Sequence, residues 1–262
     1  MNVETLISVV NGNAEEIIKK TNNKTNAIII NQCDNNSITT IKKGNIIIKY
    51  CELAERGVGL SRNNALIRAT GDILLFVDED EKLNENYEKI IINNFKKYKN
   101  ADAILFNVRS LNKERPTATI SKNQRAHKHN SLKYGAVNIA IKKSFVQKKR
   151  ISFSLLFGGG AKYQSGEDSL LISDIFKNKG IVYKSKDEIG TVSQNTSTWF
   201  AGYNRKYLNN KGALFYSIYN KWWILVAILF LLKHPKIAKD NNGIINSLNQ
   251  IKCGAKDYKY EK

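Results

Sequence analysis

The feature that most constrains this chain is a short apolar run that ends in a cluster of acids. Residues 73–77 are continuously apolar, and Gly71 and Asp72 precede them. Such a run between polar turn residues is typical of a strand buried on both faces of a parallel sheet. Asp78 and Asp80 follow at once. Because open α/β sheets bind ligands at the carboxyl ends of their strands, the run predicts an α/β fold with a polar site here.

The two aspartates suit a divalent cation. Asp78 and Asp80 are two residues apart, so in extended backbone their side chains point the same way. Carboxylate oxygens are the ligands that hard cations such as Mg²⁺ prefer, and a bound diphosphate would supply further oxygens. The alternative is a solvated turn at the end of the strand.

The rest of the first 200 residues alternates between apolar runs and amphipathic segments, which is the rhythm of a parallel sheet with crossover helices. Ser61 is a candidate N-cap for one of these helices. We predict helices at 14–20, 62–69, 87–98 and 167–177, and strands at 6–10, 27–30, 46–48, 73–77, 103–108, 136–141, 181–183 and 189–192.

Composition narrows the class of protein. The chain has 262 residues, 42% of them hydrophobic, which is enough for one large domain and a small extension. Its formal charge of +19 fits three kinds of partner, namely nucleic acid, an anionic membrane surface or anionic small molecules. Three cysteines without metal-site spacing suit a reducing compartment. The N-terminus lacks the pattern of a signal peptide, so we expect a cytoplasmic protein.

A second apolar run lies near the C-terminus. Residues 222–232 are apolar, with Lys221 and Lys233 at the two ends. The run is shorter than the roughly 20 residues of a transmembrane helix. It predicts either a helix lying in a membrane interface, peripheral on the inner face of the cell membrane, or a buried helix that closes a core.

Two blocks of the sequence resemble a known family. ERGVGLSRNNALIRATGDILLFVDED, which ends at Asp80, is similar to the nucleotide-sugar half of the family-two glycosyltransferases of GT-A fold. An Arg-Asn pair, a Gly-Asp and a strand running into Asp-X-Asp occur in the same order. GGGAKYQSGEDSLL, from Gly158, resembles the glycine loop and Glu-Asp pair of the acceptor side. The resemblance implies a Rossmann-like, mostly parallel sheet flanked by helices.

The resemblance also implies the organisation of the chain. A GT-A domain would span residues 1–200, with its nucleotide-sugar half at 1–110 and its acceptor half at 111–200. Residues 201–262 would form a helical extension that could associate with a membrane.

The resemblance implies a reaction and its residues. A nucleotide diphosphate sugar, UDP-linked by family habit, would give its sugar to an acceptor hydroxyl with inversion at the anomeric carbon. Asp78 would lie near the ribose, and Asp80 with Asp78 would hold Mn²⁺ or Mg²⁺. Asp168 is the candidate general base, and Glu167 beside it is the rival. As an alternative, both acids would only favour the N-terminus of their helix.

Further residues would hold the nucleotide. Asn11, Gln32 and Asp34 follow the first two strands, where the family binds the base, and a carboxamide satisfies the imide edge of uracil. Arg62 would meet the base or the phosphates, or would only be a surface residue. Where some members carry a metal-binding histidine, this chain has Gln194.

The leading hypothesis is therefore a glycosyltransferase that extends a bacterial surface polysaccharide or a lipid-linked glycan. A basic nucleic-acid-binding protein is the alternative that charge alone suggests, although it leaves the acidic strand end unexplained. A sugar nucleotidyltransferase is a nearer alternative. It would need a basic, glycine-rich loop after the first strand, where this chain has the short, neutral Asn11-Gly12-Asn13.

Overall fold

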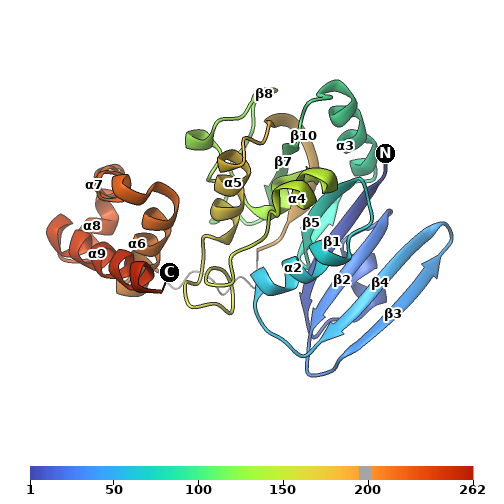
Figure 1. Cartoon of the computed structure of the whole chain (residues 1–262), viewed down its shortest axis with the longest axis horizontal. Coiled ribbons are helices and arrows are strands. Elements are labelled where there is room, and N and C mark those ends of the chain that lie inside the picture. The colour runs from blue at the N-terminus through green and yellow to red at the C-terminus, as the bar shows by residue number, and fades with distance from the viewer. Residues whose placement is uncertain (195–201, 262) are drawn as a thin grey trace. The chain divides into compact units, whose positions relative to one another are not determined.

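The structure is a computed structural model that describes residues 1–194 and 202–261, and it divides into two compact units (Figure 1). The N-terminal unit comprises residues 1–155 and 167–196, and the C-terminal unit comprises residues 156–166 and 197–262. The predicted domain boundary near residue 200 falls within 195–201, outside the described residues.

A mixed sheet forms the centre of the N-terminal unit. Its strands lie in the order β3-β4-β2-β1-β5-β9-β7-β10-β6, and β8 pairs with β10. The pairings make β4, β2, β1, β5, β7 and β10 run in one direction, with the remaining four strands antiparallel to them. The described strands are β1 (Val3–Val10), β2 (Asn26–Gln32), β3 (Ser37–Lys43), β4 (Ile46–Leu53), β5 (Ile73–Asp78), β6 (Glu81–Leu83), β7 (Ala103–Ser110), β8 (Gln124–Arg125), β9 (Ile139–Lys142) and β10 (Val182–Val192).

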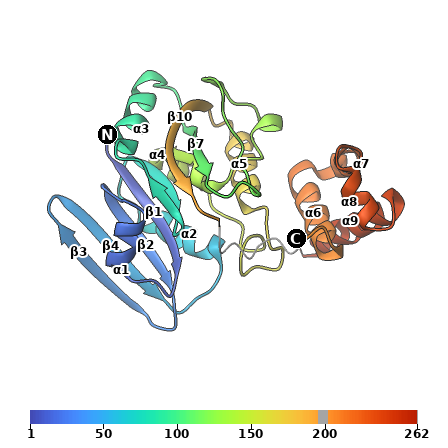
Figure 2. The same ribbon diagram turned by 180° about the vertical axis from the view of Figure 1, so that it is seen from behind.

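Helices cover both faces of this sheet, as Figures 1 and 2 show from opposite sides. Along β5, Leu74 and Phe76 belong to one hydrophobic cluster, while Leu75 and Val77 belong to another. Side chains of α2, α4 and α5 complete the first cluster, and those of α1 and α3 complete the second. The helices are α1 (Ala14–Lys20), α2 (Val58–Arg68), α3 (Tyr87–Lys97), α4 (Lys143–Lys149) and α5 (Glu167–Lys177), with 3-10 turns η1 (Lys128–Asn130) and η2 (Ala136–Asn138). The predicted α/β fold with a mostly parallel sheet is confirmed.

Several elements differ from the sequence prediction. Residues 136–138 of the predicted strand 136–141 form the 3-10 turn η2, and α4, β6 and β8 were not predicted. α2 begins at Val58 rather than after Ser61, since Gly57, with φ at 128°, makes the turn into the helix. The two late strands are one bulged strand, β10. The hairpin partner β3 was not predicted, because its residues are mostly exposed and carry no apolar alternation.

The C-terminal unit is a group of helices packed on one another, which confirms the predicted helical extension. It contains α6 (Arg205–Tyr219), η3 (Asn220–Trp222), α7 (Trp223–Lys233), α8 (Pro235–Asp240) and α9 (Ile244–Tyr260). Residues 156–166 join these helices: the Phe157 and Tyr163 rings lie 5.6 and 6.0 Å from that of Tyr258. The segment before Glu167 is therefore held by the end of the chain.

Two glycines let α6 and α9 touch backbone to backbone. A Cβ on Gly212 would lie 1.8 Å from the carbonyl oxygen of Ile251, and one on Gly254 would lie 1.8 Å from that of Asn209. Since both contacts are with backbone, no side chain can turn away to make room. The glycines therefore set how closely the two helices pack.

We predict that Gly212→Ala or Gly254→Ala loosens this unit. Forcing the helices apart should lower its free energy of unfolding by about 1–3 kcal/mol, measured by hydrogen exchange of the α6 and α9 amides. Gly159→Ala is the control, because a Cβ there would meet none of the described residues within 4 Å beyond its own chain neighbours. Equal protection in all three variants would contradict the close crossing.

Candidate active site

The predicted site residues lie along one edge of the sheet, where its parallel strands end. β1 ends at Val10, β2 at Gln32, β5 at Asp78 and β10 at Val192. These four strands run in the same direction. Segments from the beginning, middle and end of the N-terminal unit therefore meet at this edge.

Arg62 of α2 joins the two predicted groups of acids. Its Nη2 lies 2.9 Å from Asp78 Oδ1 at the end of β5. Its Nη1 lies 2.8 Å from Asp168 Oδ1 and 3.5 Å from Glu167 Oε1 at the start of α5. One guanidinium thus places the predicted catalytic acids beside the Asp-X-Asp strand end.

The start of α2 fixes the position of Arg62. The Gly57 amide donates a hydrogen bond of 2.7 Å to the Gln32 side chain, which anchors the turn to β2. One turn on, the buried Ser61 Oγ lies 2.9 Å from Ser8 Oγ on β1. These two hydrogen bonds fix the first turn of α2 against the sheet. The next residue, Arg62, therefore reaches Asp78 at the end of β5.

Arg62 keeps its positive charge although it is buried. Only 5% of its side chain is exposed, and its guanidinium carbon lies 5.2 Å from the centre of the Phe153 ring. Burial disfavours the charged form, but Asp78, Asp168 and Glu167 outweigh it, so the pKa of Arg62 is raised. The arginine is therefore a fixed cation among three carboxylates.

Both acids at the start of α5 have raised pKa values. Desolvation, together with the charge of Asp168, raises the pKa of Glu167 to about 7, against the opposing effect of Arg62. Desolvation also raises the pKa of Asp168, and again Arg62 opposes it. The Asp168 side chain is 27% exposed and that of Glu167 14%. Asp168 is thus the more open to an incoming molecule.

Asp80 is held on the other side of the strand end. The backbone amide of Gln194, just beyond β10, donates a hydrogen bond of 2.9 Å to Asp80 Oδ2. Burial, with a contribution from the Asp78 charge, raises the pKa of Asp80. The main chain of Gln194 rather than its side chain makes this contact.

Glu81, the residue after Asp-X-Asp, adds a further acid that we did not predict. Its side chain is buried, and neither carboxylate oxygen has a hydrogen-bond partner within the described residues. Burial and the charges of Asp78 and Asp80 raise its pKa well above the ordinary value. Its position within an acidic run is visible in the sequence, but its burial depends on pairing between β6 and β10.

These acids leave room for a cation. No three His, Cys, Asp or Glu side chains of the described residues are arranged as a complete metal site. Mg²⁺ and Mn²⁺ in phosphate chemistry are, however, commonly held by one or two carboxylates, with the phosphates completing the shell. Asp78 and Asp80 place two carboxylates at this strand end, beside the single cation of Arg62. The residues present therefore fit a cation that arrives with a diphosphate.

The predicted base-binding residues lie at the same edge but have other contacts. Asn11 follows β1 with a positive φ of 51°. The Gln32 side chain is buried and accepts from Gly57. Asp34 is 95% exposed and pairs with Arg56 at 2.8 Å. Arg62 is buried against the acids, so the alternative that it is only a surface residue is wrong, and its predicted contact with the base or the phosphates stays a prediction.

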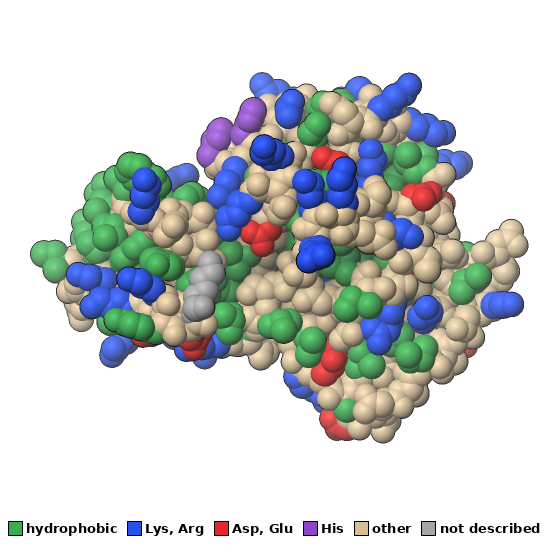
Figure 3. Space-filling model, in the orientation of Figure 1, with side chains coloured by type: hydrophobic (Ala, Val, Ile, Leu, Met, Phe, Trp, Pro, Cys, Tyr) green, Lys and Arg blue, Asp and Glu red, His purple; other side chains and the backbone are tan. Residues whose placement is uncertain are grey.

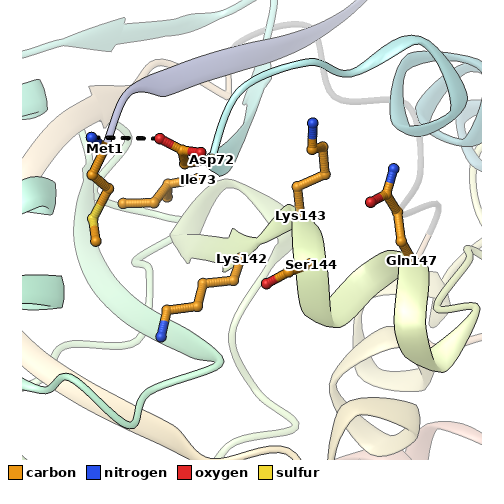
Figure 4. Close-up of a pocket in the computed structure, with 7 residues that line it drawn as sticks. All are labelled: Met1, Asp72, Ile73, Lys142, Lys143, Ser144 and Gln147. Atoms are coloured by element: carbon orange, nitrogen blue, oxygen red, sulfur yellow. Dashed lines mark ion pairs between the residues drawn. The ribbon is translucent and has the colours of Figure 1, made fainter.

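A pocket at the opposite edge of the sheet has a different character. It encloses about 360 Å³ at the amino end of β5, whereas Asp78 ends that strand (Figure 4). Lys142 and Lys143 donate to the carbonyls of Lys99 and Thr70. The pocket is lined by Met1, Asp72, Ile73, Lys142, Lys143, Ser144 and Gln147. With one acid among these residues, it does not offer the paired carboxylates of the strand-end site.

Fold and strand-end acids together define a glycosyltransferase of the GT-A class. Residues 4–151, more than half of the chain, match the family model described as glycosyl transferase family 2. The chain belongs to this family. No curated protein matches it.

Solved structures of one protein share the fold. A crystal structure of S. aureus TarS 1-349 in complex with UDP-GlcNAc aligns with a TM-score of 0.64 and 16% identity, over 84% of this chain and 67% of that one. A second crystal structure of TarS 1-349 aligns with a TM-score of 0.63 and 15% identity, over 100% of this chain and 92% of that one. A crystal structure of S. aureus TarS aligns with a TM-score of 0.62 and 15% identity, over 96% of this chain and 55% of that one. The last alignment spans about half of its longer relative.

We predict that Arg62→Met lowers the free energy of unfolding by about 1–3 kcal/mol, because it leaves three partly buried carboxylates without their cation. Arg68→Met is the matched control on the same helix, since within the described residues the guanidinium of Arg68 bonds to Asn64, one turn away. Urea denaturation measures both. Equal loss in the two variants would show that the acids do not depend on Arg62.

Proposed function

We propose that this protein transfers a sugar from a UDP-sugar to an acceptor hydroxyl, with inversion at the anomeric carbon. The observation that carries the proposal is the double contact of Arg62, which holds Asp168 beside Asp78 at the strand ends. A donor on the strand ends would then have a base candidate beside it. Binding of nucleic acid is disfavoured, because the acids at this edge would repel phosphates unless a cation intervened.

The donor half of the proposal rests on the strand ends. TarS, which shares the fold, has been crystallised with UDP-GlcNAc and with UDP. In this chain Asn11 follows β1, Gln32 ends β2 and Asp34 follows β2 by two residues. Amide and carboxylate groups there can pair with the edge of uracil, and Asp78 lies where the ribose would follow. We propose that these residues select the nucleotide.

A divalent cation completes the proposed donor site. Asp80, with Asp78, would hold Mn²⁺ or Mg²⁺, which would stabilise the negative charge of the departing diphosphate. The amide of Gln194 fixes one oxygen of Asp80 and so orients the carboxylate. Arg62 holds Asp78 in the same way from the other side.

The acceptor half rests on the start of α5. Asp168 is the proposed general base, because it is more exposed than Glu167 and is oriented by Arg62 at 2.8 Å. It would take the proton of the acceptor hydroxyl as the oxygen bonds to the anomeric carbon and the nucleoside diphosphate leaves. Glu167 would affect the protonation of Asp168, because the two carboxyl groups are neighbours. The acceptor we propose is a glycan or lipid-linked glycan of the bacterial surface.

We predict that Asp80→Asn weakens the binding of UDP in the presence of Mn²⁺ by at least about tenfold, or about 1.4 kcal/mol. Binding without the cation should change little, because the lost carboxylate acts through it. Calorimetric titration of UDP with and without Mn²⁺ measures the difference. Glu79→Gln is the control, because it removes the charge of a neighbouring acid that the proposal leaves out of the cation site. UDP binding that ignores Mn²⁺ in the unaltered protein would exclude the cation.

We predict that Asp168→Asn reduces kcat by about 10²–10⁴-fold, as expected for loss of a general base. The substitution keeps the shape of the side chain and one acceptor oxygen for Arg62. Glu167→Gln should lower kcat far less. If Glu167→Gln were the more severe of the two, the roles of the acids would be exchanged.

We predict that kcat/KM falls as the pH drops below about 7, because the acid pair must be ionised to accept a proton. The stability effect has the opposite sign. A carboxyl whose folded-state pKa is raised stabilises the fold below its unfolded pKa, and this contribution is lost as pH rises through about 7. Glu167→Gln should move the acid limb of the pH–rate profile to lower pH. A limb that does not move would separate Glu167 from the reaction.

A further inference from the structure

One side of α7, continued by Trp222 at the end of η3, is exposed. Trp222, Leu225, Leu229 and Leu232 are 60%, 51%, 56% and 59% exposed. Their spacing of three, four and three residues places them on one side of the helix. We call these four residues the apolar stripe. The sequence left open whether this run is buried or faces a membrane. In the structure the helix has both buried and exposed side chains, since Ala227 and Leu231 are fully buried while the stripe is exposed.

Further apolar side chains in the same unit are exposed. Ile244 and Ile245, at the start of α9, are 46% and 80% exposed. Figure 3 shows hydrophobic side chains gathered over the C-terminal helices, with lysines or arginines among them. Large exposed apolar patches with polar rims mark surfaces that bind another molecule. The apolar stripe therefore calls for an occupant.

The charge around the stripe indicates the chemistry of that occupant. Residues 202–261 contain ten lysines and arginines against three acids. Lys221 precedes the stripe, and Lys233 and Lys236 follow it, all of them exposed. Two copies of such a surface would bring like charges together, which disfavours a symmetric dimer. A surface of anionic lipids would attract the lysines and would also bury the apolar side chains.

The geometry favours lying on a bilayer over crossing it. By length and composition alone, Arg205–Lys233 is one candidate membrane span among the described residues. The chain bends within it, however, because Asn220 takes a φ of 47°. The 11 residues of α7 extend only about 16 Å, against a hydrocarbon core of about 30 Å. Crossing would also pull Ala227 and Leu231 out of the helical core.

We propose that the apolar stripe and its flanking lysines form a docking surface for an anionic lipid bilayer. α7 lies in the plane of the interface, with the leucines at the level of the acyl chains, Trp222 near the headgroups and the lysines against anionic lipids. The proposal does not depend on glycosyl transfer, because it concerns only how the C-terminal unit meets a membrane.

Co-flotation of the full chain with vesicles tests the proposal. The unaltered protein should float with vesicles of phosphatidylcholine and phosphatidylglycerol, and less with phosphatidylcholine alone or in high salt. Leu225→Ser with Leu229→Ser should weaken binding by at least about tenfold. Lys233→Gln with Lys236→Gln should weaken it less and reduce its dependence on salt.

Ile38→Ser with Ile67→Ser is the matched control. Both isoleucines are exposed, at 60% and 80%, but they belong to the N-terminal unit. The control should bind vesicles as the unaltered protein does. Equal loss in the control, or no flotation of the unaltered protein, would overturn the proposal. So would sedimentation showing that the stripe variants only dissociate an oligomer.

Fluorescence of Trp222 gives a readout that does not depend on flotation. The chain has three tryptophans, so Trp199→Phe with Trp223→Phe leaves Trp222 alone. Its emission should shift to the blue with anionic vesicles and should be quenched by brominated lipids. An emission spectrum that stays unchanged while the protein floats would place another surface on the membrane and overturn the role of the stripe.

Discussion

The contact of Arg62 with three carboxylates is the interaction on which the rest of this site depends. A buried cation among acids is stable only when its geometry is well supplied with hydrogen bonds. Here Asp78, Asp168 and Glu167 come from β5 and α5, which are about 90 residues apart in the chain. The arginine therefore does what a disulfide or metal does in other folds: it fixes the distance between two distant elements.

The same arrangement divides the work between the two halves of the family's fold. The strand ends carry Asp78 and Asp80, whose carboxylate oxygens suit the cation of the proposed donor. The start of α5 carries the acids with raised pKa values. Perturbed acids beside a strand-end site are the combination expected where a proton moves and a charged group departs. Neither half alone would distinguish this edge from an ordinary solvated turn.

Local signals in the sequence were enough to predict the central strands and the larger helices of the N-terminal unit, because these elements depend on neighbouring residues. The apolar run at 73–77 lies within β5, and α5 begins at Glu167 and ends at Lys177 as the helical pattern indicated. The family resemblance placed the candidate acids. Their order and spacing agree with a GT-A fold.

Other features depend on pairings between distant segments, which a single sequence does not reveal. Arg62 carries no sign that its partners are Asp168 and Glu167 rather than phosphate. Glu81 reads as one more surface acid until β6 pairs with β10. The hairpin strand β3 has neither an apolar run nor alternation, and it forms because β4 offers a free edge. The predicted roles of Asn11, Gln32 and Asp34 stay predictions.

The membership of residues 156–166 in the C-terminal unit bears on how the protein is made. This segment packs with Tyr258, nearly 100 residues later in the chain. During synthesis on the ribosome, the Phe157 and Tyr163 rings can contact each other, but their contact with Tyr258 forms only after the last helix has been made. An exchange of C-terminal modules between relatives would, for the same reason, have to replace an internal loop together with the tail.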